Sequence, residues 1–170
     1  MLGVLNRCGW EGWLRIAEPE GLGFDLSFSP IPLLIVVDDT RGWCMRVVPK
    51  MKSMLEQRGF LVTVHRMQDG PVALDGHRAV IIGAPTLGAA IRDRPPTDAF
   101  ADYVESICGL DEVQMGVFTV YAWRTGDAVQ RLKGLALRVG SRFIAGHAYP
   151  RFNLDRGAHI LPAECMVRVR

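Results

Sequence analysis

The sequence predicts an α/β protein in which helices cover both faces of a doubly wound, parallel sheet of five strands, giving three layers. Two observations lead to this fold class. Short apolar runs without charged residues recur along the chain, which is typical of strands buried on both faces. Between them stand stretches whose apolar residues repeat with the period of an α-helix. Such an alternation is typical of strands joined by helical crossovers in a parallel sheet.

Five segments match buried strands. The first is a continuous apolar run that stops at Asp38 and Asp39, and the second begins at Phe60 and is rich in β-formers. The third is followed by Gly83, and the fifth is expected to stop before Gly146. The predicted strands are 33–37, 60–66, 79–82, 113–121 and 143–145.

Three segments have the apolar spacing and end signals of helices. The first is expected to stop at Gly59, but Pro49 leaves its start open, either near Trp43 or at the proline itself. The second, 97–108, can be capped by Thr97 and ended by Gly109, and the third covers 127–139. Their expected core-facing residues are Val47, Val48, Met51, Met54 and Leu55; Phe100, Ala101, Val104, Ile107 and Cys108; and Val129, Leu132, Leu135, Ala136 and Val139.

The chain is expected to form an N-terminal extension over 1–30 and one domain over 31–170. The extension has no sustained period. The tail offers only the short segment 162–170, as a helix or, since Val167 and Val169 alternate with arginine, as a strand. One flank of the sheet is therefore expected to be covered by the extension or by a second copy of the chain, which leaves room for a homo-oligomer.

Length and composition exclude several classes of protein. The 170 residues, 49% hydrophobic and 22% charged, are typical of a globular chain. A net charge of +2, from 20 basic and 18 acidic residues, gives no reason to expect a nucleic-acid partner. No apolar run is long enough for a membrane span, and the start lacks the pattern of a signal peptide. Four scattered cysteines predict free thiols, a cytoplasmic location and no metal site.

Ligands of such sheets bind beyond the carboxyl ends of the strands, so the loops 38–44, 84–96 and 122–126 are the candidate sites. The loop after the third strand reads Gly-Ala-Pro-Thr-Leu-Gly over 83–88, and it can lay a rigid backbone against a flat ring. Tyr121, at the end of the fourth strand, and Trp123, just after it, are placed to enclose a planar ligand. His147 is the histidine expected nearest this edge.

These two loops resemble the flavin-binding loops of the flavodoxin family, and most closely those of the flavodoxin domain of flavo-diiron proteins. The resemblance covers roughly 32–150. It implies strand order 2-1-3-4-5, FMN as the cofactor, and one- or two-electron transfer. The implied cofactor-binding residues are Thr40, Arg41, Gly42, Trp43 and Cys44; Ala84, Pro85, Thr86, Leu87 and Gly88; and Thr119, Val120, Tyr121, Ala122, Trp123 and Gly126.

The loop after the first strand departs from the family. Flavodoxins there carry Ser/Thr-x-Thr-Gly-x-Thr, which holds the FMN phosphate at a helix start. This chain has Asp-Thr-Arg-Gly-Trp-Cys over 39–44, in which only Gly42 matches. Asp39 would repel the phosphate, whereas Arg41 can pair with it and Thr40 can donate a hydroxyl. We expect Arg41 to be the main phosphate contact and FMN binding to be weaker than usual.

The sequence therefore predicts an FMN-binding protein of electron transfer or flavin-dependent reduction. If it is an enzyme, it is an FMN-dependent oxidoreductase. Its electrons would come from a redox partner protein or an NAD(P)H-linked reductase. The alternative is a flavodoxin-like binding or structural subunit without a cofactor, which the altered phosphate loop favours.

Asp38 and Asp39 also resemble the acidic pair of response-regulator receiver domains. Such domains need a phosphoacceptor aspartate after the third strand, where this chain has Gly83 and Ala84. An active receiver domain is therefore not expected.

Overall fold

The computed structural model describes residues 29–86, 97–122 and 125–152. They form a five-stranded sheet in the order β2-β1-β3-β4-β5, in which every neighbouring pair of strands is parallel. The predicted fold class is confirmed. The strands are β1 (Ile31–Val37), β2 (Phe60–Arg66), β3 (Ala79–Pro85), β4 (Gln114–Tyr121) and β5 (Arg142–Pro150).

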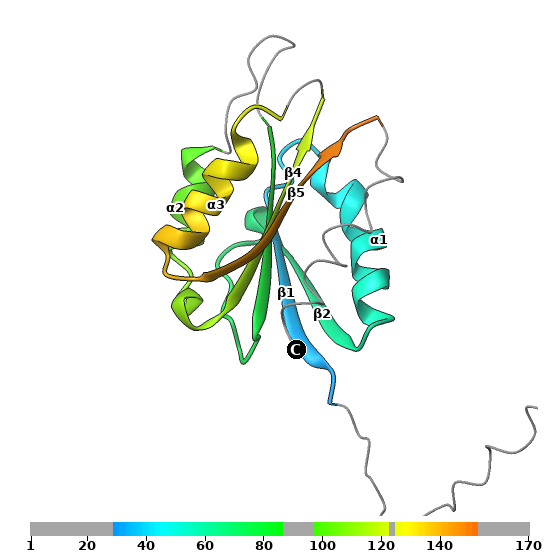
Figure 1. Ribbon diagram of the computed structural model, residues 1–170, viewed down its shortest axis with the longest axis vertical. Coiled ribbons are helices and arrows are strands. Elements are labelled where there is room, and N and C mark those ends of the chain that lie inside the picture. The colour runs from blue at the N-terminus through cyan, green and yellow to red at the C-terminus, as the bar shows by residue number, and fades with distance from the viewer. Residues whose placement is uncertain (1–28, 87–96, 123–124, 153–170) are drawn as a thin grey trace, which may run out of the picture.

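Three α-helices cover the two faces of the sheet in the described residues. They are α1 (Cys44–Glu56), α2 (Asp98–Glu105) and α3 (Ala128–Arg138). Two short 3-10 helices, η1 (Met67–Asp69) and η2 (Leu110–Glu112), lie in the connections. As Figure 1 shows, α1 lies on one side of the sheet and α2 and α3 lie on the other.

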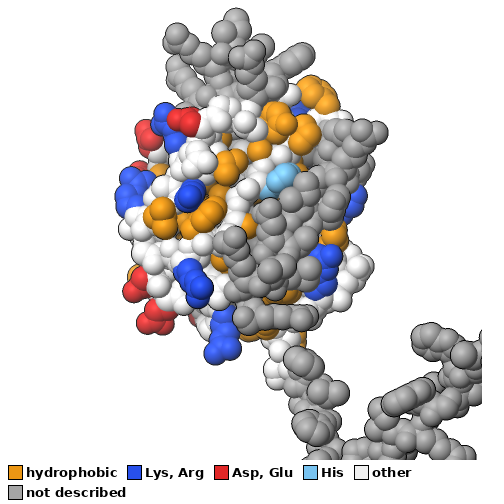
Figure 2. Space-filling view, viewed as in Figure 1, with side chains coloured by type: hydrophobic (Ala, Val, Ile, Leu, Met, Phe, Trp, Pro, Cys, Tyr) orange, Lys and Arg blue, Asp and Glu red, His pale blue; other side chains and the backbone are white. Residues whose placement is uncertain are grey.

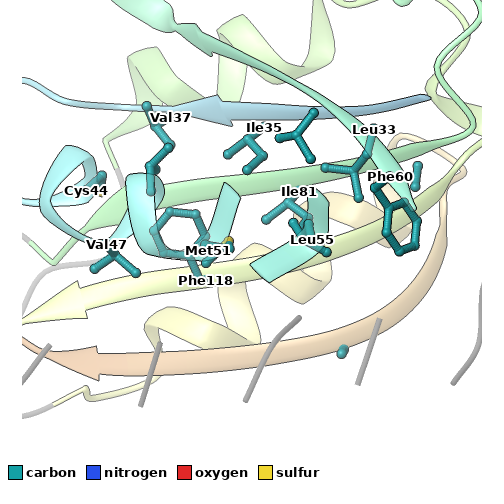
Figure 3. Packing of buried hydrophobic residues seen from close by; sticks show 14 of the residues in the cluster. Leu33, Ile35, Val37, Cys44, Val47, Met51, Leu55, Phe60, Ile81 and Phe118 are labelled. Atoms are coloured by element: carbon teal, nitrogen blue, oxygen red, sulfur yellow. The ribbon is translucent and has the colours of Figure 1, made fainter. Parts of the chain in front are cut away.

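Each face of the sheet has its own buried cluster because successive residues of a strand point to opposite faces. On β1, Leu33, Ile35 and Val37 face α1, whereas Leu34 and Val36 face α2 and α3. All five are fully buried, which explains why this strand is an unbroken apolar run. Figure 3 shows the α1 cluster, in which the helix lies over the labelled strand residues.

Helix α1 resolves the open question of where the first helix starts. It begins at Cys44 and contains Pro49, so the helix loses one backbone hydrogen bond there. Its apolar face, including Val47, Val48 and Met51, is buried against the sheet and stabilises the helix despite the proline. The helix ends at Glu56, two residues before Arg58, the last residue before the predicted stop at Gly59.

The other two helices follow the predicted spacing, with one difference at an end. The Thr97 hydroxyl accepts a hydrogen bond from the Phe100 backbone N–H at 3.2 Å, which confirms the predicted cap of α2. This helix stops at Glu105, so Cys108, predicted to face the core, is exposed. Helix α3 lies within one residue of its predicted bounds at each end.

Strand β5 is longer than predicted, and this corrects the position of His147. The predicted stop at Gly146 is wrong, because the strand continues to Pro150 beside β4. His147 therefore lies inside the strand, in register with Phe118, and its ring packs edge-on against Tyr149 at a centroid distance of 4.7 Å.

Gly83, the last residue of β3 paired with β1, is required by close packing. A Cβ atom at this position would collide with the ring of Phe118, which comes from the neighbouring position on β4. The ring is fully buried and belongs to the α1 cluster. The strand therefore has a glycine at this position because a neighbouring side chain occupies the space of a Cβ atom.

The surface of the described residues carries charges of both signs. In Figure 2, lysine and arginine side chains are spread over the visible face and are not gathered into one patch. Among the helices of the described residues, none combines the length and the apolar character needed to cross a bilayer.

Candidate functional site

The carboxyl ends of β1, β3 and β4 meet at one edge of the sheet, at the top of Figure 1. From β1 the chain continues to β2 on one side, and from β2 it crosses to β3 on the other side of β1, so the topology switches between β1 and β3. The two strand ends are joined there, since the backbone N–H of Asp38 donates to the carbonyl of Gly83 at 2.8 Å. The described first residues of the three predicted loops therefore lie at the same edge of the sheet.

The buried side chain of Asp38 stabilises the loop after β1 through hydrogen bonds. It is 1% exposed, and its Oδ1 atom accepts two hydrogen bonds, from the Thr40 backbone N–H at 3.0 Å and from Gln68 Nε2 at 3.1 Å. Gln68 lies in η1, directly after β2, and its Oε1 atom accepts from the Asp39 backbone N–H at 3.4 Å. A side chain from the neighbouring strand end thus fixes both acidic residues.

Asp39 occupies the N-terminus of α1. Its Oδ1 atom accepts a hydrogen bond from the backbone N–H of Met45 at 3.1 Å, in the first turn of the helix. Trp43, which precedes the helix, makes no side-chain capping bond, so the carboxylate of Asp39 serves as the cap from six residues away. The N-terminal N–H groups of a helix favour a negative charge at this place.

The two acidic residues also act on Cys44, the first residue of α1. Burial raises the pKa of its thiol well above the ordinary value, and the negative charges of Asp38 and Asp39 raise it further. The thiol is fully buried and packs in the α1 cluster. Cys44 is therefore a protonated core residue with no reactive thiolate.

The ends of β3 and β4 are held together by two buried threonines. Thr119 Oγ1 donates to the carbonyl of Ala84 at 2.9 Å. Thr86 donates to the carbonyl of Val120 through its backbone N–H at 2.9 Å and through Oγ1 at 3.4 Å. Both threonines are at most 1% exposed, so their hydroxyl groups stabilise the pairing of β3 and β4.

The accessible candidates lie just beyond these bonds. Tyr121, the last residue of β4, and Ala122, the next residue, are half-buried. Gly126 is exposed before α3 and has a positive φ of 52°. The backbone N–H of Arg151, directly after β5, donates to the Tyr121 carbonyl at 2.7 Å. The candidates Leu87, Gly88 and Trp123 lie outside the described residues.

Two arginines meet at Trp43. The guanidinium of Arg41 lies 5.5 Å from the centre of the indole ring, and that of Arg151 lies 4.6 Å from it. Arg41 and the neighbouring Thr40 and Gly42 are exposed, whereas Trp43 is half-buried. Cation–π contacts of this kind hold both charges against the ring at the start of α1.

The loop after β1 does not fit a phosphate in the way that the resemblance implies. The Met45 N–H already binds a carboxylate, and a second buried carboxylate lies beside it. A phosphate at this helix start would have to replace the Asp39 side chain or approach two like charges.

The sequence did not predict that Gln68 would bind Asp38 and Asp39, or that Arg151 would contact Trp43 and Tyr121, at this edge. Gln68 is the second residue after β2, and Arg151 is the first residue after β5. Parallel strands bring all their carboxyl ends to one edge, so the first residues after every strand were the available signal. Within the described part of the chain, no group of three or more histidine, cysteine or acidic side chains is placed to hold a metal ion.

A cavity of about 530 Å³ lies at the opposite edge, among residues at the starts of β1, β3 and β4. Arg78, Glu112 and Gln114 contribute polar groups to its lining. It is remote from the carboxyl ends of the strands, where ligands of such sheets bind. The candidate site is therefore the carboxyl edge.

No protein-family model and no curated protein match the sequence. Among solved structures, the chain is similar to oxidised flavodoxin 1 of Bacillus cereus, with a TM-score of 0.64, 18% identity, and coverage of 82% of this chain and 99% of that one. It is also similar to the flavodiiron core of Flv1 from Synechocystis sp. PCC6803, with a TM-score of 0.59 and 15% identity, over 84% of this chain and 37% of that chain.

A third similar structure is a flavodoxin variant of Fusobacterium nucleatum bound to flavin mononucleotide. The TM-score is 0.52 at 12% identity, over 66% of this chain and 67% of that chain. Identities this low establish the fold alone. Together with the order of the five parallel strands, they show that this chain has the flavodoxin-like fold.

Proposed function

We propose that the chain is a flavin-dependent electron-transfer protein that binds the flavin ring at the carboxyl edge of the sheet. The observation that carries the proposal is the switch point between β1 and β3, where the ends of β3 and β4 are fixed to each other. Ligands of doubly wound sheets bind at this place. The similar structures, which are flavodoxins and a flavodiiron core, support the choice of a flavin.

In this proposal the loops after β3 and β4 hold the ring. Ala84, Thr86, Thr119 and Val120 are buried, so they contribute backbone that their hydrogen bonds keep rigid. Tyr121, which is half-buried, contacts the ring, and Trp123 is predicted to contact it as well. Pro85, Leu87, Gly88, Ala122 and Gly126 complete the proposed contact set.

A bound flavin would supply reversible one- or two-electron chemistry. The chain's own part is to orient the ring and to exclude water from one of its sides. The electrons would come from a redox partner protein or from an NAD(P)H-linked reductase. FMN is the flavin that the resemblance implies.

The test is a titration of the purified chain with riboflavin and with FMN, followed by quenching of flavin fluorescence. We expect saturable quenching, and we expect Tyr121→Ala and Trp123→Ala each to weaken binding of both flavins by about fivefold. Leu137→Ala, at an exposed position of α3, is the control and should change neither. Absence of quenching by both flavins in the wild type would contradict the proposal.

A second candidate is a binding or structural subunit without a cofactor. The observation that favours it is the hydrogen bond between the Asp39 carboxylate and the backbone N–H of Met45. Through this bond, a side chain of the protein itself occupies the place at the start of α1 where a phosphate would bind. A folded protein that binds neither flavin would support this candidate. The flavin titration therefore decides between the two.

A further inference from the structure

Carboxylate and carbonyl oxygens of this chain already satisfy several of the donors around the start of α1. The Asp39 carboxylate accepts from Met45, and its backbone carbonyl accepts from Gly42 at 2.9 Å. The Asp38 carboxylate accepts from Thr40. The phosphate-binding character of a helix N-terminus depends on such N–H groups being available to the ligand. Here the loop itself uses the Met45, Gly42 and Thr40 donors.

Asp39 supplies the negative charge that a helix N-terminus favours. It reaches the first turn from six residues away, and Gln68 holds its backbone while also binding Asp38. The carboxylate is therefore fixed by contacts on both sides of the loop. Burial is the main reason that the pKa of the neighbouring Cys44 thiol is raised, and the negative charges of Asp38 and Asp39 raise it further.

The nearby cations do not restore a built phosphate site. Arg41 and Arg151 lie against the ring of Trp43, and the Arg41 side chain is exposed to solvent. Exposed cations attract an anion weakly because water and salt screen the charge. The two arginines offset part of the repulsion that Asp38 and Asp39 exert on a phosphate. They do not release the Met45 N–H from its hydrogen bond to Asp39.

We propose that the Asp39 carboxylate takes the place of a ligand phosphate at the N-terminus of α1, so that this edge selects a flavin by its ring and not by its phosphate. The inference rests on the proposed flavin site and narrows its ligand to the class of flavins recognised without a phosphate contact, with riboflavin as the simplest member.

The first experiment compares the affinities of riboflavin and FMN for three proteins. For the wild type we expect the two dissociation constants to agree within about threefold, the scale of an exposed charge contact. Asp39→Ala removes both the charge and the acceptor, and it should favour FMN over riboflavin by about tenfold, the scale of a charge-assisted hydrogen bond. Asp39→Asn removes the charge but keeps an acceptor for Met45, so its preference for FMN should be smaller than that of Asp39→Ala.

Results of that titration separate the two proposals. A wild type that binds FMN more than about tenfold tighter than riboflavin would overturn the inference and leave the flavin site standing. The same holds if Asp39→Ala leaves the ratio unchanged. If neither flavin binds to any of the three proteins, the proposed function fails, and a flavin-free measurement decides the inference.

That measurement is a titration with inorganic phosphate, followed by the amide resonance of Met45 in NMR spectra. In the wild type the resonance should not respond beyond a chloride control of equal ionic strength. In Asp39→Ala it should shift in a saturable way, because the N–H is released. A saturable shift in the wild type, or no shift in Asp39→Ala, would overturn the inference. If Asp39→Ala does not fold, Asp39→Asn serves in its place, because its side chain can still cap the Met45 N–H. In this variant the Met45 resonance should not respond to phosphate. A saturable shift would count against the proposal.

Discussion

The loop after β1 and the paired ends of β3 and β4 lie at the same edge of the sheet, but they satisfy their polar groups in different ways. After β1, two carboxylates bind backbone N–H groups of the loop and of α1. At β3 and β4, two buried threonines donate to carbonyls of the neighbouring strand. The first arrangement places negative charge at the helix start, and the second is neutral and leaves Tyr121 accessible beyond it.

In the proposed function, the neutral region of this edge carries the flat, neutral flavin ring, and the region at the helix start does not hold an anion. A neutral strand junction can carry a ring without electrostatic cost, whereas charges at a helix start select against a like charge. The following changes disturb one region at a time, so each shows how strongly that region contributes to the fold.

The largest effect is expected at the end of β3. Gly83→Ala should destabilise the protein by about 3 kcal/mol, because the new methyl group collides with the buried Phe118 ring. Chemical denaturation measures the change. Gly134→Ala on α3 is the control: a Cβ there meets no atom within 4 Å, so it should raise stability by up to about 1 kcal/mol. Equal effects at both positions would contradict the packing argument.

Removing the buried carboxylate after β1 should have the next largest effect. Asp38→Ala deprives the Thr40 N–H and the Gln68 amide of their shared acceptor and should lower the free energy of unfolding by about 2 kcal/mol. Denaturation of Asp102→Ala, at an exposed position on α2, gives the baseline. A loss no larger than that baseline would show that Asp38 does not hold the loop.

Alkaline pH should weaken the fold through Cys44. Its folded-state pKa is raised, so the folded chain keeps a proton that the unfolded chain loses above pH 9.0, the ordinary cysteine value. Stability from this group is complete below pH 9.0 and should fall by about 1.4 kcal/mol per pH unit above it. Unfolding measured across this range should show a smaller slope for Cys44→Ala, and an unchanged slope for Cys108→Ala, whose thiol is exposed. The same slope in all three proteins would refute the assignment.

The smallest effect is expected at the threonine junction. Thr119→Val keeps the shape of the side chain but leaves the Ala84 carbonyl without its hydroxyl donor, which should lower stability by about 1 kcal/mol. The matched change Thr97→Val, which removes the cap of α2, should cost a similar amount through a different element. If Thr119→Val also leaves flavin binding unchanged, the junction stabilises the sheet without shaping the proposed ring site.

Parts of the fold could be read from the sequence because their signals are local. The apolar run of β1, the stripe and glycine stop of α3, and the Thr97 cap each arise from residues close together in the chain. The proline inside α1 illustrates the limit of such signals. Local propensity favours a break at Pro49, and burial of the helix face against the sheet overrides it.

The sequence alone determined the fold class, the approximate positions of its elements, and the presence of an unusual acidic loop after the first strand. Tertiary structure decided the length of β5, because pairing with β4 carries the strand past Gly146 and His147. It also decided the role of the acidic loop. Asp38 and Gln68 are 30 positions apart, and Trp43 and Arg151 are farther apart still. These contacts form because a parallel sheet brings the carboxyl ends of strands that are distant in the sequence to one edge. The periodicity within a single segment carries no information about which other segments it will contact.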